Sequence, residues 1–261
     1  MPLDDATRAG LADELYAAFR DAEPIDPLTD RHELDVADAY DIQTRLIDQR
    51  LADGASVVGH KVGLTSDGIQ EQLGVDRPDF GRVLDTMFRP DGVVPTGDLI
   101  VPRIEPEVGF LMAEGLEPPV THLDVLAATE AVLPVLEIID SRVRDWQIEL
   151  EDTIADNASS ALYVAGGATH TVEGRDLSLE GVKLRRNGEV VSTGVGAAVL
   201  DHPAKAVAWL ANTLGGMDAS LGAGDIVLSG SVTPAVDLAP GDVFTAEFTT
   251  IGTVTARAED A

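Results

Sequence analysis

The hydrophobic pattern of the chain changes near residue 55, and this change restricts the folds that the chain can adopt. Before it, apolar residues recur at three- and four-residue intervals, as on one face of an α-helix. After it, they gather in short runs of the kind that form β-strands. These runs lie at 56–62, 107–112, 135–140, 182–193, 225–229 and 243–256. The pattern predicts helices at the start of the chain and a mostly β remainder.

Two helices are predicted within the first 55 residues. Leu11, Leu15 and Phe19 share one face of the first helix, and prolines follow it. The second helix begins at Asp35, a residue type that caps helix starts, and it ends at Gly54. We therefore expect a small helical part at the N-terminus.

The remainder of the chain carries two clear local signals. Asn187-Gly188 separates two β-like segments and predicts a two-residue hairpin turn. A helix is expected from His202-Pro203 to the glycine pair at 215–216. No repeat, low-complexity linker or charge block marks a domain boundary. The predicted fold class is therefore α+β, with a helical region at 1–55 and a β body at 56–261, both expected within one continuous domain.

Acidic residues outnumber basic ones 46 to 18 and are spread along the chain, which gives a formal net charge of −28. Such a surface repels phosphate backbones, so we expect no nucleic-acid partner. Only Lys61, Lys183 and Lys205 are lysines. Because salt screens self-repulsion on this scale, we interpret the composition as halophilic, an adaptation to a salty cytoplasm. An ordinary acidic enzyme remains the alternative.

Several classes of protein are excluded by what the sequence lacks. Cysteine is absent, which excludes a disulfide scaffold, thiolate catalysis, zinc fingers and iron–sulfur clusters. No apolar run reaches the roughly 18–20 residues of a membrane span, and the first ten residues do not resemble a signal peptide. We therefore expect a cytoplasmic protein with no membrane partner. The motifs of nucleotide-binding loops, serine hydrolases and zincins are also missing.

Two glutamates stand two residues apart at the start of a β-like run, in the segment RIEPEVGF at 103–110. Glu105 and Glu107 should lie on the same face of a strand, because side chains alternate with a period of two. Two adjacent carboxylates repel each other unless a cation or a proton lies between them. The alternative is a solvated strand face, which is natural in so acidic a protein.

A third glutamate, Glu137, is embedded in the apolar run PVLEIID at 134–140. An unpaired buried carboxylate is costly, so Glu137 needs a metal ion, a basic partner or a raised pKa. A salt bridge to Arg142 is one alternative. Three carboxylates without histidine or cysteine would suit a hard divalent ion, Mg²⁺ or Mn²⁺.

Lys61 lies in a glycine-flanked apolar run, VVGHKVGLTS at 57–66, in a chain with few lysines. A buried lysine there would titrate lower than a free one and could exchange protons near neutrality. The alternative is a surface lysine whose stem is buried and whose charge reaches water. Asp79, in RPDFG at 77–81, is interpreted from the residues alone as a turn residue.

Six motifs occur in order along the chain, and together they closely resemble one family. The resemblance is to the 2-keto-4-pentenoate hydratase (2-hydroxypenta-2,4-dienoate hydratase) family within the fumarylacetoacetate hydrolase superfamily, and it covers roughly residues 36–256. The motifs are GHKVGLTS at 59–66, QLGVDRPDFG at 72–81, RIEPEVGF at 103–110, LEIIDSRVRDW at 136–146, DTIADNASS at 152–160 and LDHPAKAVAWLAN at 200–212.

The resemblance implies a mixed β-roll body of the fumarylacetoacetate hydrolase C-terminal type and a divalent metal held by three residues. The implied ligands are Glu105, Glu107 and Glu137. It also implies that Lys61 and Asp79 transfer protons. By position, Ser231 would hold the substrate carboxylate, with Asn157 and Ser160 near the pocket.

The implied reaction is the metal-dependent hydration of 2-hydroxypenta-2,4-dienoate to 4-hydroxy-2-oxopentanoate, in meta-cleavage of aromatic compounds. Decarboxylation of 4-oxalocrotonate and hydration of 2-oxohept-enedioate on the same metal core are the alternatives, followed by an acylpyruvate-type C–C hydrolase. A homo-oligomer is expected, alone or associated with a sister enzyme of the pathway. From a different class, a non-catalytic partner of such an enzyme also stays open.

Overall fold

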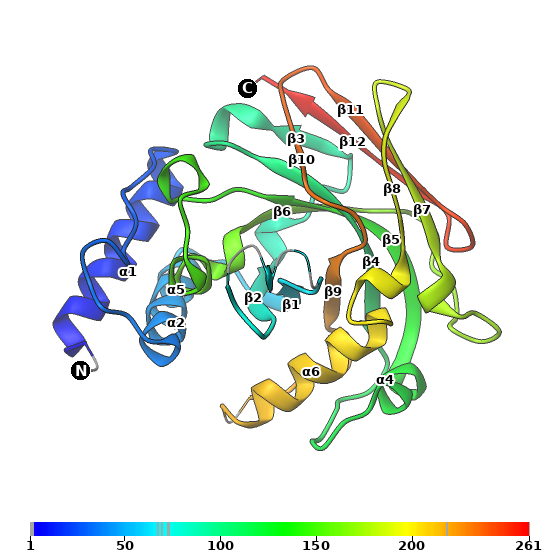
Figure 1. Cartoon of the computed structure of the whole chain (residues 1–261), viewed down its shortest axis with the longest axis horizontal. Helices are drawn as coiled ribbons and strands as arrows, with labels where there is room; N and C mark the ends of the chain where they lie inside the picture. The colour runs from blue at the N-terminus through cyan, green and yellow to red at the C-terminus, as the bar shows by residue number, and fades with distance from the viewer. Residues whose placement is uncertain (1–2, 67, 69, 72–73, 218, 261) are drawn as a thin grey trace.

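The computed structural model describes residues 3–66, 68, 70–71, 74–217 and 219–260, and two β-sheets dominate it (Figure 1). Its helices are α1 (Asp5–Asp21), α2 (Val36–Ala52), α4 (His122–Ala128), α5 (Leu150–Ala155) and α6 (Pro203–Gly215). Its strands are β1 (Val57–Gly63), β2 (Asp79–Leu84), β3 (Val93–Pro95), β4 (Arg103–Met112), β5 (Thr129–Ile139), β6 (Ser160–Ala165), β7 (Gly181–Arg186), β8 (Glu189–Val195), β9 (Ile226–Ser231), β10 (Val236–Asp237), β11 (Val243–Phe248) and β12 (Thr253–Glu259).

The first sheet is mixed and curls around the centre of the molecule (Figure 1). Its strand order is β2-β1-β9-β4-β5-β6, and β10 pairs with β4 beside this path. Strand β1 runs parallel to β9, whereas the other neighbours along the path are antiparallel. The second sheet has the order β3-β12-β11-β7-β8. The predicted α+β class and mixed β-roll body are confirmed.

Alternate residues of β4 and β5 enter different parts of the core. Ile104, Phe110 and Leu136 belong to a large cluster that includes side chains of α6 and of the second sheet. Leu133 and Val135 belong to a smaller cluster with residues of β2, β6 and β9. Because side chains alternate along a strand, the face that carries Leu133 and Val135 is also the face of residue 137.

The N-terminal helices form a separate hydrophobic contact with α5. Leu11 and Leu15 of α1 and Ile42 of α2 are buried together with Ile154 and Ala155 of α5. The predicted start of α2 is confirmed, because the Asp35 side chain accepts a hydrogen bond of 2.8 Å from Asp38 N. The boundary proposed between 1–55 and 56–261 stays a prediction.

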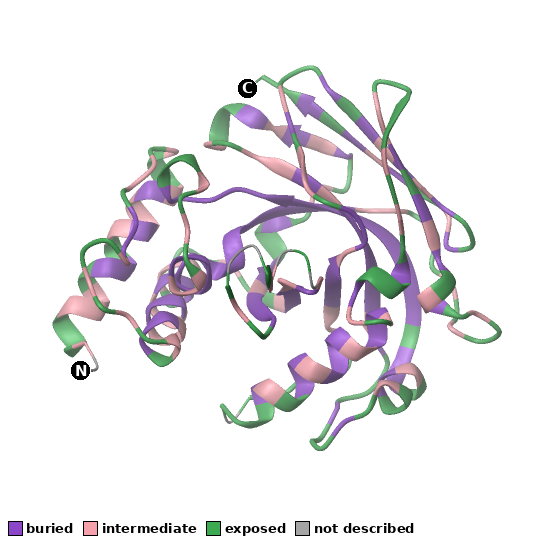
Figure 2. Cartoon of the chain, viewed as in Figure 1, coloured by how far each residue is buried: buried purple, intermediate pink, exposed green. Residues whose placement is uncertain are grey.

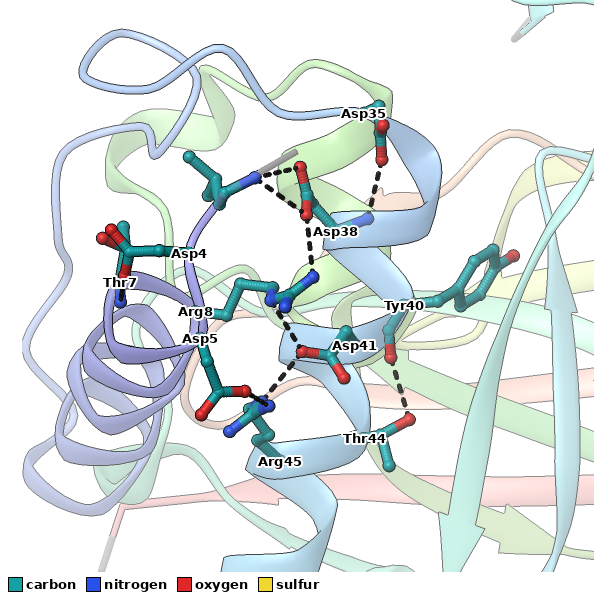
Figure 3. A network of polar contacts seen from close by, with 11 residues as sticks. Asp4, Asp5, Thr7, Arg8, Asp35, Asp38, Tyr40, Asp41, Thr44 and Arg45 are labelled. Carbon is teal, nitrogen blue, oxygen red and sulfur yellow. Dashed lines mark hydrogen bonds and ion pairs between the residues drawn. The ribbon is translucent and has the colours of Figure 1, made fainter. Parts of the chain in front are cut away.

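Polar contacts join α1 to α2 on their outer side (Figure 3). Arg8 lies 3.3 Å from Asp38 and 3.1 Å from Asp41, and Arg45 lies 2.9 Å from Asp41. Arg45 also pairs with Asp5 of α1 at 2.5 Å. We call these five residues the α1–α2 network. Its charges alternate in sign, so each arginine has acidic partners.

The strand and helix predictions hold for the most periodic segments and fail for others. The Asn187-Gly188 turn joins β7 to β8, and His202 caps α6 as expected. The interpretation of Asp79 as a turn residue was wrong, because Asp79 is the first residue of β2. Almost all of β2 is buried, so its residues show no alternation of apolar and polar types. The first two residues of the 72–81 motif lie outside the described residues.

No helix in the described part of the chain is long and apolar enough to span a membrane. The buried residues follow the two sheets and the inner sides of the helices, while the hairpin between β7 and β8 is largely exposed (Figure 2).

Candidate active site

Three glutamates meet on one face of the curled sheet. Glu105 and Glu107 belong to β4, and Glu137 of β5 pairs directly with Glu105 in the strand register. One carboxylate oxygen from each of the three lies within 4.8 Å of the others. The prediction that Glu105 and Glu107 share a face is confirmed, and Glu137 lies beside them.

The carboxylates of this cluster are largely enclosed by the protein and only partly hydrogen-bonded. Glu107 is 1% exposed and Glu137 is 0% exposed, whereas Glu105 is partly exposed, so the alternative of a solvated strand face is wrong for Glu107. Gly230 N donates to Glu107 Oε2 at 2.8 Å, and Ser160 Oγ donates to Glu137 Oε1 at 2.9 Å. Within the described residues, Glu107 Oε1 and Glu137 Oε2 receive no hydrogen bond. Glu107 Oε1 is thus left open to a cation, and Glu137 Oε2 has an ion pair with Lys61 Nζ but no hydrogen bond.

Arg142 is not the partner of Glu137, so that alternative was also wrong. Its guanidinium Nε donates to Asp156 Oδ1 at 2.5 Å, and its Nη2 donates to the Asp156 carbonyl at 2.7 Å. Both side chains are buried. Burial raises the pKa of Asp156 to about 6, against the opposing effect of Arg142.

Lys61 of β1 is the basic residue that reaches Glu137. Its Nζ lies 3.5 Å from Glu137 Oε2 and donates a hydrogen bond of 2.9 Å to the Ala158 carbonyl. The side chain is 5% exposed, so Lys61 is not a surface lysine with its charge in water. Burial alone would lower the pKa of Lys61, but the surrounding carboxylates outweigh it and raise the pKa. The expectation of a lowered pKa was therefore wrong in direction.

Asp79 enters the same space from β2. It is 1% exposed and lies opposite Gly63 of β1 in the strand register. A Cβ atom at Gly63 would overlap Asp79 Oδ1 and lie 3.2 Å from Lys61 Nζ, so the two side chains approach each other over this glycine. Asp79 Oδ1 has no hydrogen-bond partner among the described residues. Burial raises the pKa of Asp79, and the charge of Lys61 opposes this.

The charge balance of the site is strongly negative. The three glutamates and Asp79 face a single ammonium group, that of Lys61. Burial and the neighbouring carboxylates raise the pKa of Glu105 to about 7 and raise that of Glu107 well above its ordinary value. A bound cation would relieve this repulsion. The donor atoms are all carboxylate oxygens, and two of these oxygens accept no hydrogen bond within the described residues. The site therefore fits a hard divalent cation.

The three residues expected near the substrate lie around the cluster. Ser160 contacts Glu137, as described above, and Ser231 of β9 lies opposite Glu107 in the register. The Ser231 hydroxyl donates locally to the Thr233 carbonyl at 2.5 Å. Asn157 uses its side-chain amide to bond the backbone of Arg82 in β2, at 2.8 and 3.0 Å. Their contacts with a substrate stay predictions.

Sequence reasoning missed two backbone groups of the site, the Ala158 carbonyl and the Gly230 N–H. Both depend on unusual backbone conformations, since Ala158 has a φ of 51° and Gly230 a φ of 102°. The only signal in the sequence was the polar segment DNASS at 156–160, which interrupts apolar surroundings. Backbone donors and acceptors carry no residue type that a motif could reveal.

Two cavities flank the segment that leads into β2. One of about 400 Å³ is lined by Tyr40, Trp209 and Thr213, and another of about 790 Å³ by residues 148–151. Both also touch Asp76 and Arg77. Neither cavity is lined by Lys61, Glu105, Glu107 or Glu137, so these cavities do not mark the position of the reacting atoms.

Comparison with known proteins gives one consistent family. Residues 66–259 match the model of the fumarylacetoacetate hydrolase C-terminal family. The chain is 46% identical over 251 residues to 2-keto-4-pentenoate hydratase of Paraburkholderia xenovorans, which covers 95% of this chain and 93% of that protein. It is 42% identical over 250 residues to 4-oxalocrotonate decarboxylase of Pseudomonas sp. strain CF600, covering 95% of each.

Solved structures agree with this assignment. The structure of 4-oxalocrotonate decarboxylase from Pseudomonas putida G7, complexed with magnesium and adipate, superposes with a TM-score of 0.95 at 39% identity and covers 98% of both chains. Fumarylpyruvate hydrolase from Pseudomonas aeruginosa shares only the fold, with a TM-score of 0.62, 14% identity, and coverage of 77% of this chain and 89% of that one. The chain therefore belongs to the fumarylacetoacetate hydrolase superfamily and, within it, to the 2-keto-4-pentenoate hydratase family.

Proposed function

We propose that the chain is a divalent-metal-dependent hydro-lyase that hydrates 2-hydroxypenta-2,4-dienoate to 4-hydroxy-2-oxopentanoate. The observation that carries this proposal is the group of three glutamates, two of them buried, next to Lys61 and Asp79. Relatives at 42–47% identity are named as hydratases of this substrate. From the family resemblance we also propose that the reaction belongs to aromatic meta-cleavage catabolism.

In this proposal Glu105, Glu107 and Glu137 hold Mg²⁺, with Mn²⁺ as the alternative ion. When bound, the ion acts as a Lewis acid that stabilises negative charge on a 2-oxo acid. The chain itself sets the orientation of two of these ligands. Gly230 N donates to one oxygen of Glu107 and Ser160 Oγ to one oxygen of Glu137, and the second oxygen of each accepts no hydrogen bond within the described residues.

Lys61 and Asp79 would carry the protons of the reaction. Hydration requires a proton at C5, water at C4 and a proton at C3, while the enol hydroxyl and the water each give up a proton. The raised pKa of Lys61 favours the ammonium form, which can donate, whereas Asp79 Oδ1 has no hydrogen-bond partner among the described residues and can accept. Because the two groups meet over Gly63, a proton taken up by one can return through the other.

A substrate with one carboxylate fits the arginines on the elements that carry the site. Arg142 is paired with Asp156, and Arg103 lies 3.2 Å from Asp237. Arg82 donates to Gln43 Oε1 at 3.0 Å and to Thr44 Oγ1 at 3.2 Å. Each of these arginines already has a partner within the described structure. This favours the five-carbon dienoate over 4-oxalocrotonate or a heptenedioate, which carry a second carboxylate.

Product analysis tests the proposal directly. The purified protein with Mg²⁺ is supplied separately with the five-carbon dienol and with the six-carbon diacid, and products are followed by mass spectrometry. We expect the five-carbon acid to gain water. Loss of CO₂ from the diacid at a higher kcat/KM would show a decarboxylase instead, and no turnover of either substrate would favour a non-catalytic partner.

We further propose that the protein acts in the cytoplasm as a homo-oligomer, alone or with a sister enzyme of the same pathway. The family resemblance supports an assembly, and the acidic composition supports function in high salt. Light scattering of the purified protein, with and without the partner enzyme of the same source, measures both assemblies.

A further inference from the structure

The backbone beside Lys61 forms a left-handed turn that no glycine supports. Asn157, Ala158 and Ser159 have φ values of 54°, 51° and 53°. Non-glycine residues avoid this region because the Cβ atom approaches the following carbonyl, and three in succession are rare. Such a conformation persists only where its surroundings hold it in place.

Asn157 fastens this turn to strand β2. Its side-chain Oδ1 accepts from Arg82 N at 2.8 Å, and its Nδ2 donates to Arg82 O at 3.0 Å. One side chain thereby satisfies both backbone groups of one residue. The neighbouring Gly81 allows the approach, because a Cβ there would collide with the Asn157 carbonyl.

The buried pair of Arg142 and Asp156 closes the turn from the other side. Arg142 Nη2 donates to the carbonyl of Asp156, before the turn, and lies 3.4 Å from that of Ser160, after it. Two backbone hydrogen bonds also hold the turn. Ser159 N donates to Asp156 O at 3.0 Å, and Asp140 N donates to Ser159 O at 2.8 Å. The turn is held at both ends and in the middle.

The held turn presents two groups to the site. The Ala158 carbonyl accepts from Lys61 Nζ at 2.9 Å, and Ser160, directly after the turn, donates to Glu137. Lys61 Nζ is thus fixed between a carbonyl of the turn and Oε2 of Glu137 at 3.5 Å. In a right-handed turn the Ala158 carbonyl would point elsewhere, and Lys61 would lose this acceptor.

We infer that the left-handed turn at 157–159 positions the ammonium group of Lys61, and that Asn157 is a positioning residue for Lys61. This inference rests on the proposed function, because only that function gives Lys61 a proton to transfer. It assigns the amide of Asn157 to the backbone of β2 and not to the substrate.

The test uses Asn157→Gly, which keeps a residue that readily adopts positive φ but removes both hydrogen bonds to Arg82. The matched control is Asn212→Ala. Asn212 of α6 bonds both backbone groups of Val120 at 2.8 Å, the same arrangement in the layer of α4 and α6. Both variants lose two hydrogen bonds to the backbone of one residue, Asn157 at a buried position and Asn212 at an exposed one. Asn157 belongs to the turn whose Ala158 carbonyl accepts from Lys61, whereas Asn212 lies on α6.

The chain has three lysines, so NMR of protein labelled with ¹³C at lysine Cε gives one signal set for each. Lys183 and Lys205 have side chains 46% and 43% exposed and serve as internal references. In the wild type we expect inequivalent ε-protons for the fixed Lys61. In Asn157→Gly they should become equivalent or broaden, while Mg²⁺ affinity measured by calorimetry stays within about threefold.

Kinetics of the same variants complete the test. We expect kcat of Asn157→Gly to fall about 10- to 100-fold with KM within about threefold, since misplacing a proton-transfer group affects turnover more than binding. Asn157→Asp, which keeps the acceptor for Arg82 N, should lie between it and the wild type, and it carries the comparison if the glycine variant does not fold. Asn212→Ala should match the wild type in both measurements.

The NMR and kinetic results separately test the positioning of Lys61 and its catalytic role. An unchanged Lys61 signal in Asn157→Gly would overturn the inference, whatever happens to activity. A mobile Lys61 with an unchanged kcat would overturn the catalytic role of Lys61 and with it this part of the proposed function, while the structural role of the turn would stand.

Discussion

The molecule holds two groups of charged side chains that differ in burial and in balance. The α1–α2 network has two arginines among three aspartates, and most of its members reach solvent (Figure 3). The site cluster of Lys61, Asp79, Glu105, Glu107 and Glu137 has one cation among four carboxylates, and all of its members except the partly exposed Glu105 are buried. In the exposed network the positive and negative charges nearly balance. In the buried cluster the negative charges outnumber the positive charge of Lys61 by three.

This difference separates a structural from a functional arrangement of the same residue types. Exposed ion pairs contribute little to stability, typically about 0–1 kcal/mol, because water and salt screen them. A buried excess of carboxylates costs stability unless a cation binds, so its presence is evidence for a ligand. Three experiments test this contrast, and a further one tests a buried group outside both clusters.

The largest effect is expected on removing the cation or one of its ligands. Chelation with EDTA should abolish turnover, and Mg²⁺ or Mn²⁺ should restore it, because no other group of the site offsets four carboxylates. Glu137→Gln should behave like the chelated enzyme in activity assays and should bind Mg²⁺ poorly by calorimetry. Glu130→Gln, on an exposed position of the same strand, is the control. Full activity of the metal-free protein would refute the site.

Substitution of Lys61 should separate binding from proton transfer. Lys61→Met should still bind Mg²⁺ and oxalate, because the three glutamates remain, but its kcat should fall by about 10² to 10⁴. Stopped-flow or steady-state assays with the dienol measure kcat. Lys205→Met, which removes an exposed lysine paired with Asp201, should leave kcat unchanged. A Lys61→Met enzyme with wild-type kcat would make Lys61 a structural residue.

A third prediction concerns a buried group outside both clusters, His60. Burial, and then the nearby charge of Arg82, lower the pKa of His60 to about 4, and its ring packs against Phe80. The unfolded chain binds a proton near pH 6.5 and the folded chain does not, so stability falls as the pH drops from about 6.5 towards 4. Between pH 7 and pH 5 the loss should be about 2 kcal/mol.

Urea unfolding of the wild type and of His60→Leu at both pH values measures this loss. Other groups titrate in the same range, so the relevant quantity is the difference between the pH dependences of the two proteins. His60→Leu should lack the contribution of about 2 kcal/mol. Equal pH dependences would show that folding does not lower the pKa of His60.

The smallest effect is expected on the exposed side of the comparison. The net charge of −28 lies on a compact surface, and raising the salt from 0.1 to 1 M shortens the screening length from about 10 Å to about 3 Å. The melting temperature should therefore rise as KCl increases from 0.1 to 2 M. KCl is a weak salting-out agent, so calorimetric scans in KCl report mainly screening. A flat or falling melting temperature would contradict the halophilic interpretation.

The site residues that could be predicted from the sequence were mostly charged residues within apolar segments. Glu137 in an apolar run and Lys61 between glycines stood out because burial of a charge is costly, and the structure buries both. The spacing of Glu105 and Glu107 gave their shared face. Helical periodicity and capping residues predicted the helices α1, α2 and α6, and the Asn187-Gly188 pair predicted the turn between β7 and β8.

The remainder depended on long-range pairing and on backbone geometry. The register that sets Glu105 beside Glu137, and the one that sets Asp79 beside Gly63, cannot be read from local patterns. The partner of Arg142 was misjudged for the same reason, because Asp156 reaches it only through the turn before β6. Strands β2 and β6 are buried on both faces and so lack the alternation that marks a strand.

The parallel pairing of β1 with β9 also bears on how the protein folds. Residue 59 pairs with residue 226, and β9 lies between β1 and β4, so Lys61 and the glutamates come together through contacts distant in sequence. Contacts this distant in sequence close slowly, since the entropy of a long loop is lost before any contact rewards it. We therefore expect the local helices to form early and the charged site to assemble among the last parts of the structure. In a refolding experiment, recovery of Mg²⁺ binding should lag behind recovery of helical circular dichroism, and the ion would report completion of the native topology.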